Sequence, residues 1–386
     1  MDDSRLNILI ADFHLQGGGQ VRYLLSLARE LVRLGHRVTV GCRSGSVLVE
    51  GAREAGCEVL DRFNFRGGLR PFSWANDLRR ARQFIRRSNP DILHVNGSQD
   101  HWALALANRG LGFPVCLLRT RHNTYTVKDH LPNRLLNRDW TDYQIVVCDV
   151  VRRTLAGQRA FDPTRLCSIH NGVDAEKYRA DPERRAAARA EFGYTDDDLV
   201  CGIAARMVPA KGHQFLFRAA AQLAKHYPGL KLLCLGQGAL EGELRTLAAS
   251  LRLADRVTFA GFRGDMDSCL QAVDIGVQPS IDCDTSSFSL KELMALEIPV
   301  IASDHGGLKE IVSDGVEGFV VHAGTVEPLA AALRRMADSA ELRARMGRMG
   351  RQRVLKDFTV EVFARRTEHA YRRAIEIHRQ RRPRTM

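Results

Sequence analysis

The sequence has no run of apolar residues near the ~18 that a membrane-spanning helix needs, and its N-terminus does not look like a secretory signal. In MDDSRLNILIADF two acids precede the first basic residue, and the apolar run is short and ends in polar residues. None of the nine cysteines forms a CxxC pair, and most lie in apolar runs such as IVVC and KLLCLG. We therefore expect reduced core thiols in a cytosolic protein, with no disulfide framework, metal or other cofactor.

No short repeat and no low-complexity segment interrupts the 386 residues, apart from an arginine-rich C-terminal end. A chain of this length is too long for one compact core, and its 45% hydrophobic and 26% charged residues are ordinary for a soluble globular protein. We expect an N-terminal domain over residues 1–175, a second domain over 176–358, and a helix with a basic tail over 359–386.

Short apolar strands alternate with helices through both halves of the chain. The first helix, Val21–Leu34, places Leu24, Leu27 and Leu31 on one face and ends before Gly35. The expected strands cover residues 7–13, 36–42, 92–95, 115–119 and 143–148, and then 199–205, 230–235, 257–260, 275–279 and 300–302. This alternation predicts an α/β fold of two Rossmann-like, doubly wound domains, which bind ligands at the carboxyl ends of their parallel strands.

The net charge of +12 is unevenly distributed. Residues 1–172 carry 25 Lys and Arg against 16 Asp and Glu, and the last 22 residues carry eight arginines against two glutamates. Such a field attracts an anionic membrane surface or an acidic glycolipid, although a merely solvated arginine-rich surface explains it equally well. No nucleic-acid-binding motif accompanies the charge, so nucleic acid is not an expected partner.

Two loops between expected strands and helices carry residues suited to phosphate. The QGGG sequence at 16–19 lets backbone N–H groups approach an anion, but a tight turn without a ligand explains it as well. Arg206 and Lys211 lie between a strand and a helix. Two cations at the carboxyl edge of a strand suit a diphosphate leaving group, which we prefer to the alternative of two surface cations.

A third motif, DTSSFSLKE, runs from Asp284 to Glu292. Ser286 or Ser287 can cap a helix that starts at Phe288, and the N–H groups of its first turn then point at a phosphate. One of the two carboxylates is suited to ribose hydroxyls and the other to the sugar. Taken alone, the two acids are equally explained as a turn residue and a solvated helix acid.

Three smaller features follow other expected strands. They are GQG at 236–238, GFR at 261–263, and His122 in RTRHN. A lone histidine is usually structural, but His122 lies at a strand end beside Arg119 and Arg121 in the basic half. We therefore include it among the candidate site residues.

Taken together and in order, these segments resemble family 4 of the retaining glycosyltransferases. GGGQVRYLLSLARELVRLGH is similar to the family's N-terminal glycine loop and helix, HNGVD to its interdomain segment, and GIAARMVPAKGH to its donor-phosphate segment. VTFAGFRGDM resembles its base-binding loop, and DTSSFSLKELMALEIPVIASDHGG its Glu-x7-Glu region. The resemblance spans nearly the whole chain. It implies the GT-B fold, in which two Rossmann-like domains face each other and a C-terminal helical segment returns to the N-terminal domain.

The resemblance also implies a role for each matching residue. Arg206 and Lys211 would bind the donor diphosphate, His122 would contact the transferred sugar, and these three would form the catalytic set with Asp284. The base, ribose, distal phosphate and glycine-loop contacts would come from Gly18, Gly19, Gly236, Phe262, Arg263, Phe288, Ser289, Leu290 and Glu292. No metal is implied, because cations and helix N-termini hold the phosphates. Asp284 departs from the family pattern, which usually has Glu, and this departure leaves its role open.

The implied function is transfer of a hexose-type sugar from a nucleotide-sugar donor to a glycan or glycolipid acceptor with retention of configuration. The leaving phosphate would help to deprotonate the acceptor, and the setting would be cell-surface polysaccharide or lipopolysaccharide synthesis at the inner membrane face. A nucleotide-sugar epimerase of the same fold and a non-catalytic glycan-binding homologue are the alternatives. The Arg206 and Lys211 pair argues against the first, and Asp284 motivates the second.

Overall fold

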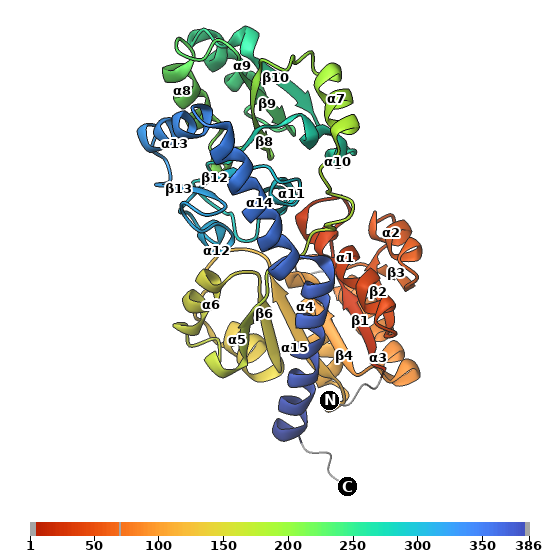
Figure 1. Ribbon diagram of the computed structural model, residues 1–386. Coiled ribbons are helices and arrows are strands. Elements are labelled where there is room, and N and C mark those ends of the chain that lie inside the picture. Colours follow the sequence, from red (N-terminus) through yellow and green to blue (C-terminus); the bar gives the residue numbers. More distant parts are fainter. Residues whose placement is uncertain (1–4, 69–70, 383–386) are drawn as a thin grey trace. The chain divides into compact units, whose positions relative to one another are not determined.

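The computed structural model describes residues 5–68 and 71–382, and the chain divides into two compact units (Figure 1). The first unit combines Met1–Gly172 with Val360–Met386, and the second is Val173–Thr359. Each unit is built on one parallel β-sheet. Every candidate site residue can therefore be placed relative to one of two sheets.

The sheet of the first unit has the strand order β3-β2-β1-β4-β5-β6-β7. Its strands are β1 (Asn7–Ala11), β2 (Arg37–Arg43), β3 (Glu58–Phe63), β4 (Ile92–Val95), β5 (Cys116–Arg121), β6 (Tyr143–Val146) and β7 (Leu166–Ser168). The helices are α1 (Gly19–Arg33), α2 (Leu48–Glu54), α3 (Pro71–Ser88), α4 (Ser98–Arg109), α5 (Leu131–Arg134), the π-helix η1 (Leu135–Trp140), α6 (Asp149–Ala156), the 3₁₀ turn η2 (Pro163–Arg165) and α15 (Val360–Arg381). The strand order reverses between β1 and β4, which is where doubly wound sheets bind ligands.

Helices cover both faces of this sheet. On one face α3, α4 and η1 pack Phe84, Leu104 and Leu136 into a shared apolar core. On the other face α1 buries its leucine stripe, and Tyr23 of α1 meets Phe363 of α15 with ring centroids 4.8 Å apart. Because both faces are covered, the central strands β1 and β4 consist almost wholly of buried apolar residues.

The sheet of the second unit has the strand order β10-β9-β8-β11-β12-β13. Its strands are β8 (Leu199–Ala204), β9 (Leu230–Leu235), β10 (Val257–Gly261), β11 (Ile275–Gln278), β12 (Val300–Ser303) and β13 (Gly318–Val321). Its helices are α7 (Pro182–Glu191), η3 (Pro209–Lys211), α8 (His213–Leu223), α9 (Glu241–Ser250), η4 (Ala254–Arg256), α10 (Met266–Cys269), η5 (Leu270–Ala272), α11 (Phe288–Ala295), α12 (Leu308–Ile311), α13 (Glu327–Ala337) and α14 (Ala340–Asp357). Here the order reverses between β8 and β11, so the segments after these two strands share the carboxyl edge.

The C-terminal helix α15 is an integral part of the first unit. Its Tyr371 is fully buried and bonds His94 Nδ1 of β4 at 2.7 Å, and His94 Nε2 lies 2.7 Å from Thr120 Oγ1 of β5. These hydrogen bonds satisfy a histidine that has no exposed surface, which burial would otherwise make costly. The last helix is thereby fixed to the middle of the sheet.

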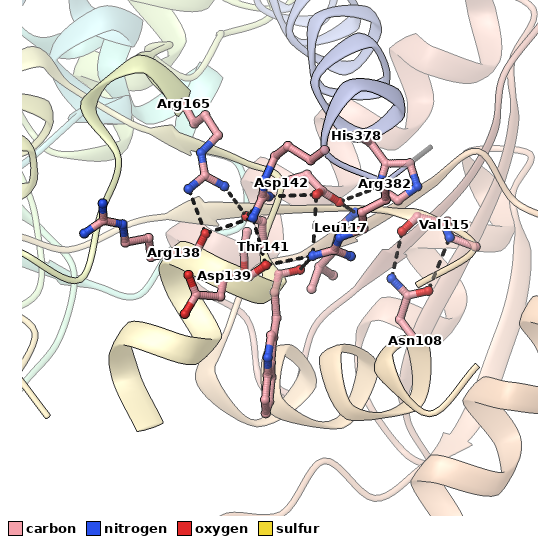
Figure 2. Close-up of polar contacts among 12 residues, drawn as sticks. Asn108, Val115, Leu117, Arg138, Asp139, Thr141, Asp142, Arg165, His378 and Arg382 are labelled. Atoms are coloured by element: carbon pink, nitrogen blue, oxygen red, sulfur yellow. Dashed lines mark hydrogen bonds and ion pairs between the residues drawn. The ribbon is translucent and has the colours of Figure 1, made fainter. Parts of the chain in front are cut away.

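Two arginines near the arginine-rich C-terminal end, Arg381 and Arg382, are held within the first unit. Asp142, which has no exposed surface, lies 2.9 Å from Arg381 Nη1. Its carboxylate also lies 2.8 Å from His378 Nδ1 (Figure 2). Arg381 and Arg382 also donate to the backbone carbonyl groups of Arg138, Asp139, Trp140 and Thr141. The two guanidinium groups turn inward because they form ion pairs with a buried carboxylate and hydrogen bonds with the carbonyl groups at the end of η1. Residues 383–386 lie outside the described residues.

Within residues 5–68 and 71–382, no helix combines the length and the apolar character needed to cross a membrane. Each of the nine cysteines is a free thiol, and seven of them are buried. Burial raises the pKa of Cys42 and of Cys234 to about 12, so these thiols remain protonated and unreactive at neutral pH.

Candidate functional site

A polar cluster of the second unit lies just beyond the carboxyl end of β11. Asp284 Oδ2 accepts hydrogen bonds from Gln278 Nε2 at 2.9 Å and from Ser280 Oγ at 2.7 Å, and it pairs with Lys211 Nζ at 2.8 Å. Asp284 is 4% exposed, whereas the side chain of Lys211 keeps 16% of its surface. The structure thus brings together two predicted site residues, and the lysine remains accessible from one side.

A tightly packed loop places Lys211. The lysine ends η3, and Gly212 follows it with a φ of +71° directly before α8. A Cβ atom at Gly212 would lie 2.0 Å from the carbonyl oxygen of Pro279, so the loop packs backbone to backbone against the segment after β11. In the same contact Ile281 N donates to Ala210 O at 2.9 Å. Only glycine permits this approach, which holds Lys211 beside Asp284.

The start of α11 adjoins the same cluster. Ser287 caps the helix by accepting a hydrogen bond from Leu290 N at 3.3 Å, as one of the two serines was predicted to do. Ser289 Oγ donates to Gln278 Oε1 at 3.2 Å, which ties the first helical turn to the residues around Asp284. Because the N–H groups of a first helical turn attract anions, the predicted contacts at residues 288–290 lie where a phosphate would be favoured.

Glu292 and its neighbour Lys291 are buried within α11. Glu292 is 1% exposed, so the alternative of a solvated helix acid is wrong. Lys291 is fully buried, donates from Nζ to Ser286 Oγ at 2.7 Å, and lies 5.2 Å from the centre of the Phe358 ring. Charged residues are almost never fully buried unless they are paired. The contact of Glu292 with ribose stays a prediction.

Two predicted residues follow β8 and β9. Arg206 is exposed and forms no ion pair with any residue in the described part of the chain. Gly236 has a φ of +134°, and a Cβ atom there would lie 2.2 Å from Ala205 O. Glycine at this position therefore lets the segments that follow β8 and β9 approach closely.

The predicted base-binding loop follows β10. The ring of Phe262 is 75% exposed. Beside it, the Arg263 guanidinium is held by Glu191 at 2.6 Å and by Asp265 at 2.7 Å. The Arg263 side chain is thus paired within its own unit, and the contact of this loop with a base stays a prediction.

In the first unit, Gly18 is the exposed residue directly before α1, and Gly19 is the exposed first residue of that helix. A Cβ atom built at Gly17, Gly18 or Gly19 would meet no described atom within 4 Å. Packing therefore does not require these glycines. Close approach of a ligand to the backbone and the demands of the turn itself both remain as explanations.

His122 directly follows β5 and packs against the carboxyl edge of the sheet. Its Nε2 atom lies 2.9 Å from Asn96 Oδ1, and its ring meets Tyr23 edge to face with centroids 4.6 Å apart. Burial lowers the pKa of His122 to about 3, so the imidazole is neutral at pH 7. Since the Asn96 carbonyl oxygen only accepts, Nε2 carries the proton in this contact.

Several polar residues at this edge were not singled out from the sequence. Asp12 directly follows β1 and has no exposed surface, and its carboxylate accepts from His14 Nδ1 at 2.7 Å and from Gln20 Nε2 at 2.5 Å. The hydrogen bond with Asp12 raises the pKa of His14. Asp100, at the start of α4, accepts from Asn96 N at 2.8 Å. The signal that identifies Asp12 and Asn96 is their position immediately after a buried strand.

The candidate residues therefore form two sets, each within one unit. The first unit holds Gly18, Gly19 and His122, and the second holds the remaining ten predicted residues around the ends of its strands. Only the second set contains cations placed to neutralise a diphosphate.

One group of side chains in the described ranges has the spacing of metal ligands. The ligand atoms of Cys116, Asp142 and His378 all lie within 4.8 Å of one another. However, Arg381 lies 2.9 Å and Arg382 3.7 Å from the Asp142 carboxylate. Two guanidinium charges oppose the entry of a cation, so we assign this group a structural role.

Comparison with known families agrees with this division of the chain. Residues 17–177 match the family described as Glycosyltransferase Family 4, and residues 184–353 match the family described as Glycosyl transferases group 1. The chain belongs to glycosyltransferase family 4. Gly18 and His122 fall within the first matched segment, and Arg206, Lys211, Asp284 and Glu292 fall within the second.

Curated relatives of this family member align over different lengths. Its alignment with the putative glycosyltransferase EpsD of Bacillus subtilis is 32% identical over 194 residues, and the aligned region covers 50% of this chain and 51% of EpsD. It is 29% identical over 374 residues to the D-inositol 3-phosphate glycosyltransferase of Saccharomonospora viridis, which covers 87% of this chain and 84% of that protein. The chain thus spans about half the length of EpsD and of other relatives that it matches at similar identity.

Solved structures show that the family member has the GT-B fold. A glycosyltransferase from Rickettsia africae superposes with a TM-score of 0.86 at 21% identity, over 96% of this chain and 99% of that one. HepE from Anabaena, in complex with UDP-glucose, superposes with a TM-score of 0.80 at 21% identity, over 96% and 100% of the two chains. The fold class expected from the sequence is confirmed.

Proposed function

We propose that the protein transfers a hexose-type sugar from a nucleotide-sugar donor to a glycan or glycolipid acceptor. The observation that carries the proposal is the cluster in which Lys211 meets Asp284, Gln278 and Ser280 beside the start of α11. A cation and the N–H groups of a helix start, gathered at one sheet edge, suit the negative charge that develops on a departing diphosphate. HepE, which has this fold, was solved with UDP-glucose, and this supports a nucleotide sugar as the donor.

In this proposal the candidate site residues of the second unit bind different parts of the donor. Arg206 and Lys211 stabilise the diphosphate as the bond to the sugar breaks, and Glu292 holds the ribose. The backbone at Phe262 and Arg263 contacts the base, while the first turn of α11 holds the distal phosphate. These cations and N–H groups replace a metal ion in neutralising the phosphates.

His122 and Asp284 belong to the sugar end of the donor in this proposal. The neutral imidazole of His122, oriented by Asn96, is suited to a hydrogen bond with a sugar hydroxyl. Asp284 has the additional task of holding Lys211 in place. Gly18 and Gly19 leave room for the donor at the start of α1.

The proposal further includes retention of configuration, an anionic acceptor and a place in cell-surface polysaccharide or lipopolysaccharide synthesis on the cytoplasmic side of the membrane. In this proposal retention arises because the acceptor attacks from the face that the leaving group departs, and the leaving phosphate takes the proton of the acceptor hydroxyl. An anionic acceptor is supported by the positive charge of residues 1–172 and by the relative named for D-inositol 3-phosphate.

The test is release of nucleoside diphosphate from UDP-, GDP- and ADP-hexoses in the presence of lipid-linked and lipopolysaccharide-core acceptors. Arg206→Ala and Lys211→Ala should each lower the rate about 10²–10³-fold, as loss of one transition-state charge commonly does. Lys225→Ala, which removes an exposed lysine after α8, is the matched control and should leave the rate unchanged. Wild-type rates in the Arg206 and Lys211 variants would contradict the phosphate assignment.

The same assay separates the alternatives. The anomeric configuration of the product, read by NMR, decides between retention and inversion. Epimerisation of a free donor without any acceptor would favour a nucleotide-sugar epimerase. Binding of a glycan without turnover of any donor would favour a non-catalytic homologue.

A further inference from the structure

The outward face of α3 carries arginines along most of its length, after an aromatic beginning. We call this set the α3 face; at three- and four-residue spacing it comprises Phe72, Ala75, Arg79, Arg82, Gln83, Arg86 and Arg87. All of these residues are exposed except Arg82, which is partly buried. The opposite side of the helix packs Ala81, Phe84 and Ile85 into the core of the first unit. The helix is therefore anchored by one side and presents the other to the surroundings.

The positive charge of the α3 face is not neutralised within the protein. None of its four arginines forms an ion pair with a residue in the described ranges 5–68 and 71–382. They line a shallow groove of about 630 Å³, in which no acidic residue takes part. Like charges three and four residues apart destabilise a helix, so a row of uncompensated arginines points to an anionic partner.

Phe72 gives the same face an apolar end. Its side chain is 91% exposed, more than that of any other large hydrophobic residue among those described. Trp74, in the same helical turn, is held by a hydrogen bond from its Nε1 to Gly68 O at 3.3 Å. Basic residues beside an exposed aromatic ring combine attraction to lipid phosphate groups with an apolar side chain that can enter the headgroup layer of a bilayer. We therefore favour an anionic bilayer over a polyanion in solution as the partner of this face.

A second basic surface of the first unit lacks this combination. On α15, Arg365, Arg366, His369 and Arg373 line a pocket of about 590 Å³ together with residues of β6 and β7. Arg373 pairs with Glu376 at 2.9 Å, and no large hydrophobic side chain of the described part of α15 is exposed. The α15 surface therefore serves as a comparison of similar charge without an apolar end.

We propose that the α3 face docks the first unit on an anionic bilayer, with the arginines against lipid phosphate groups and Phe72 between the acyl chains. Arg381 and Arg382, which belong to the expected C-terminal basic tail, pair with Asp142 instead of presenting free charge. The proposal is independent of sugar transfer, because α3 contains no candidate site residue and vesicle binding needs no turnover. Docking would place the protein where an acceptor carried by a lipid is found.

The test is flotation of the full-length protein with vesicles that contain phosphatidylglycerol, at low and at high salt, with pure phosphatidylcholine vesicles as the neutral comparison. The variant Arg79→Gln/Arg86→Gln/Arg87→Gln keeps residues of good helix propensity. Its partition coefficient should fall about 10²-fold, since each basic residue at an anionic surface contributes about fivefold. High salt should weaken wild-type binding in the same direction.

The matched control is Arg365→Gln/Arg366→Gln/Arg373→Gln, which removes the same charge from α15. Because it lowers only the net positive charge of the protein, it should change vesicle binding by no more than about threefold. Phe72→Ser should weaken binding about tenfold, as loss of one inserted aromatic side chain implies. Thermal melts that match the wild type show that each variant is folded.

Four results would overturn the proposal. They are an absence of wild-type binding at low salt, unchanged binding of the α3 arginine variant, equal losses in the α3 and α15 variants, and full binding by Phe72→Ser. Equal losses in the two arginine variants would mean that vesicle binding depends on net charge alone. Full binding by Phe72→Ser would indicate a polyanion in solution as the partner instead of a bilayer.

Discussion

Replacing Arg381 with methionine should lower the free energy of unfolding of the first unit by about 3 kcal/mol. The guanidinium group donates to Asp142 Oδ1 at 2.9 Å, to Thr141 O at 3.1 Å and to Asp139 O at 2.8 Å. Breaking a buried ion pair by removing one partner costs about 3–5 kcal/mol. The lower end applies because the Arg381 side chain is 27% exposed and His378 still reaches the Asp142 carboxylate at 2.8 Å. Methionine retains an apolar stem, so the loss measures the charge and its hydrogen bonds.

The assay is urea unfolding followed by tryptophan fluorescence. The three tryptophans, Trp74, Trp102 and Trp140, all lie in the first unit, so their signal reports that unit alone. With an m-value of about 1–3 kcal/mol/M, the loss shifts the midpoint by about 1–3 M. Arg379→Met removes the same charge from an exposed position and should cost less than about 0.5 kcal/mol. A wild-type midpoint for Arg381→Met, or the same shift in both variants, would refute the role of the buried pair.

Two further changes test the site and the buried histidines. Gly212→Ala should weaken nucleoside diphosphate binding about tenfold in calorimetric titration. The new Cβ atom would lie 2.0 Å from Pro279 O, and the resulting strain of about 1–3 kcal/mol would move Lys211. Unchanged affinity would contradict this loop geometry. Burial lowers the pKa of His94 to about 3, so the folded state favours the neutral imidazole. The stabilisation of the folded state by neutral His94 is therefore complete above pH 6.5. As the pH falls below 6.5, the free energy of unfolding decreases by up to about 1.4 kcal/mol per pH unit. Between pH 6.5 and 5 the urea midpoint of His94→Gln should therefore change less steeply than that of the wild type, and equal slopes would count against the neutral histidine.

The strands that the sequence missed share an edge position, although this position alone does not decide the outcome, since the edge strand β10 was predicted at residues 257–260. The central strands β4 and β9 were predicted at the residues that the structure shows, because strands buried on both faces are continuous apolar runs. The three missed strands, β3, β7 and β13, all lie at an edge of their sheet. The β3 strand is half exposed and reads EVLDRF, and β7 has three residues. An edge strand covered on fewer sides keeps polar residues or shortens, and it then loses the pattern that identifies it.

The site shows the same division between local and tertiary information. Lys211 and Asp284 were each predicted, from a strand end and from a helix start, but their contact was not. That contact joins residues 73 positions apart and depends on the loop after β8 packing against the segment after β11. The pairing of Arg381 with Asp142 was not predicted for a similar reason, since Asp142 lies 239 positions away. Sequence patterns assign chemistry to segments, while partners distant in the chain are decided by the strand order.

The position of Asp284 explains why an aspartate suits this site. Its backbone cannot retreat, because Gly307 N donates to Asp284 O at 3.1 Å and a Cβ atom at Gly306 would lie 2.0 Å from the same oxygen. From this fixed backbone the short side chain places one oxygen within 2.9 Å of Gln278, Ser280 and Lys211 together. A glutamate would carry the carboxylate one methylene farther and lose at least one of these donors. Asp284 thus holds the ammonium group of Lys211 ordered, and in the proposed donor complex this order lowers the entropy lost on binding a diphosphate. An aspartate with this contact therefore fits the proposed donor site, and its presence in place of glutamate does not by itself indicate a non-catalytic homologue.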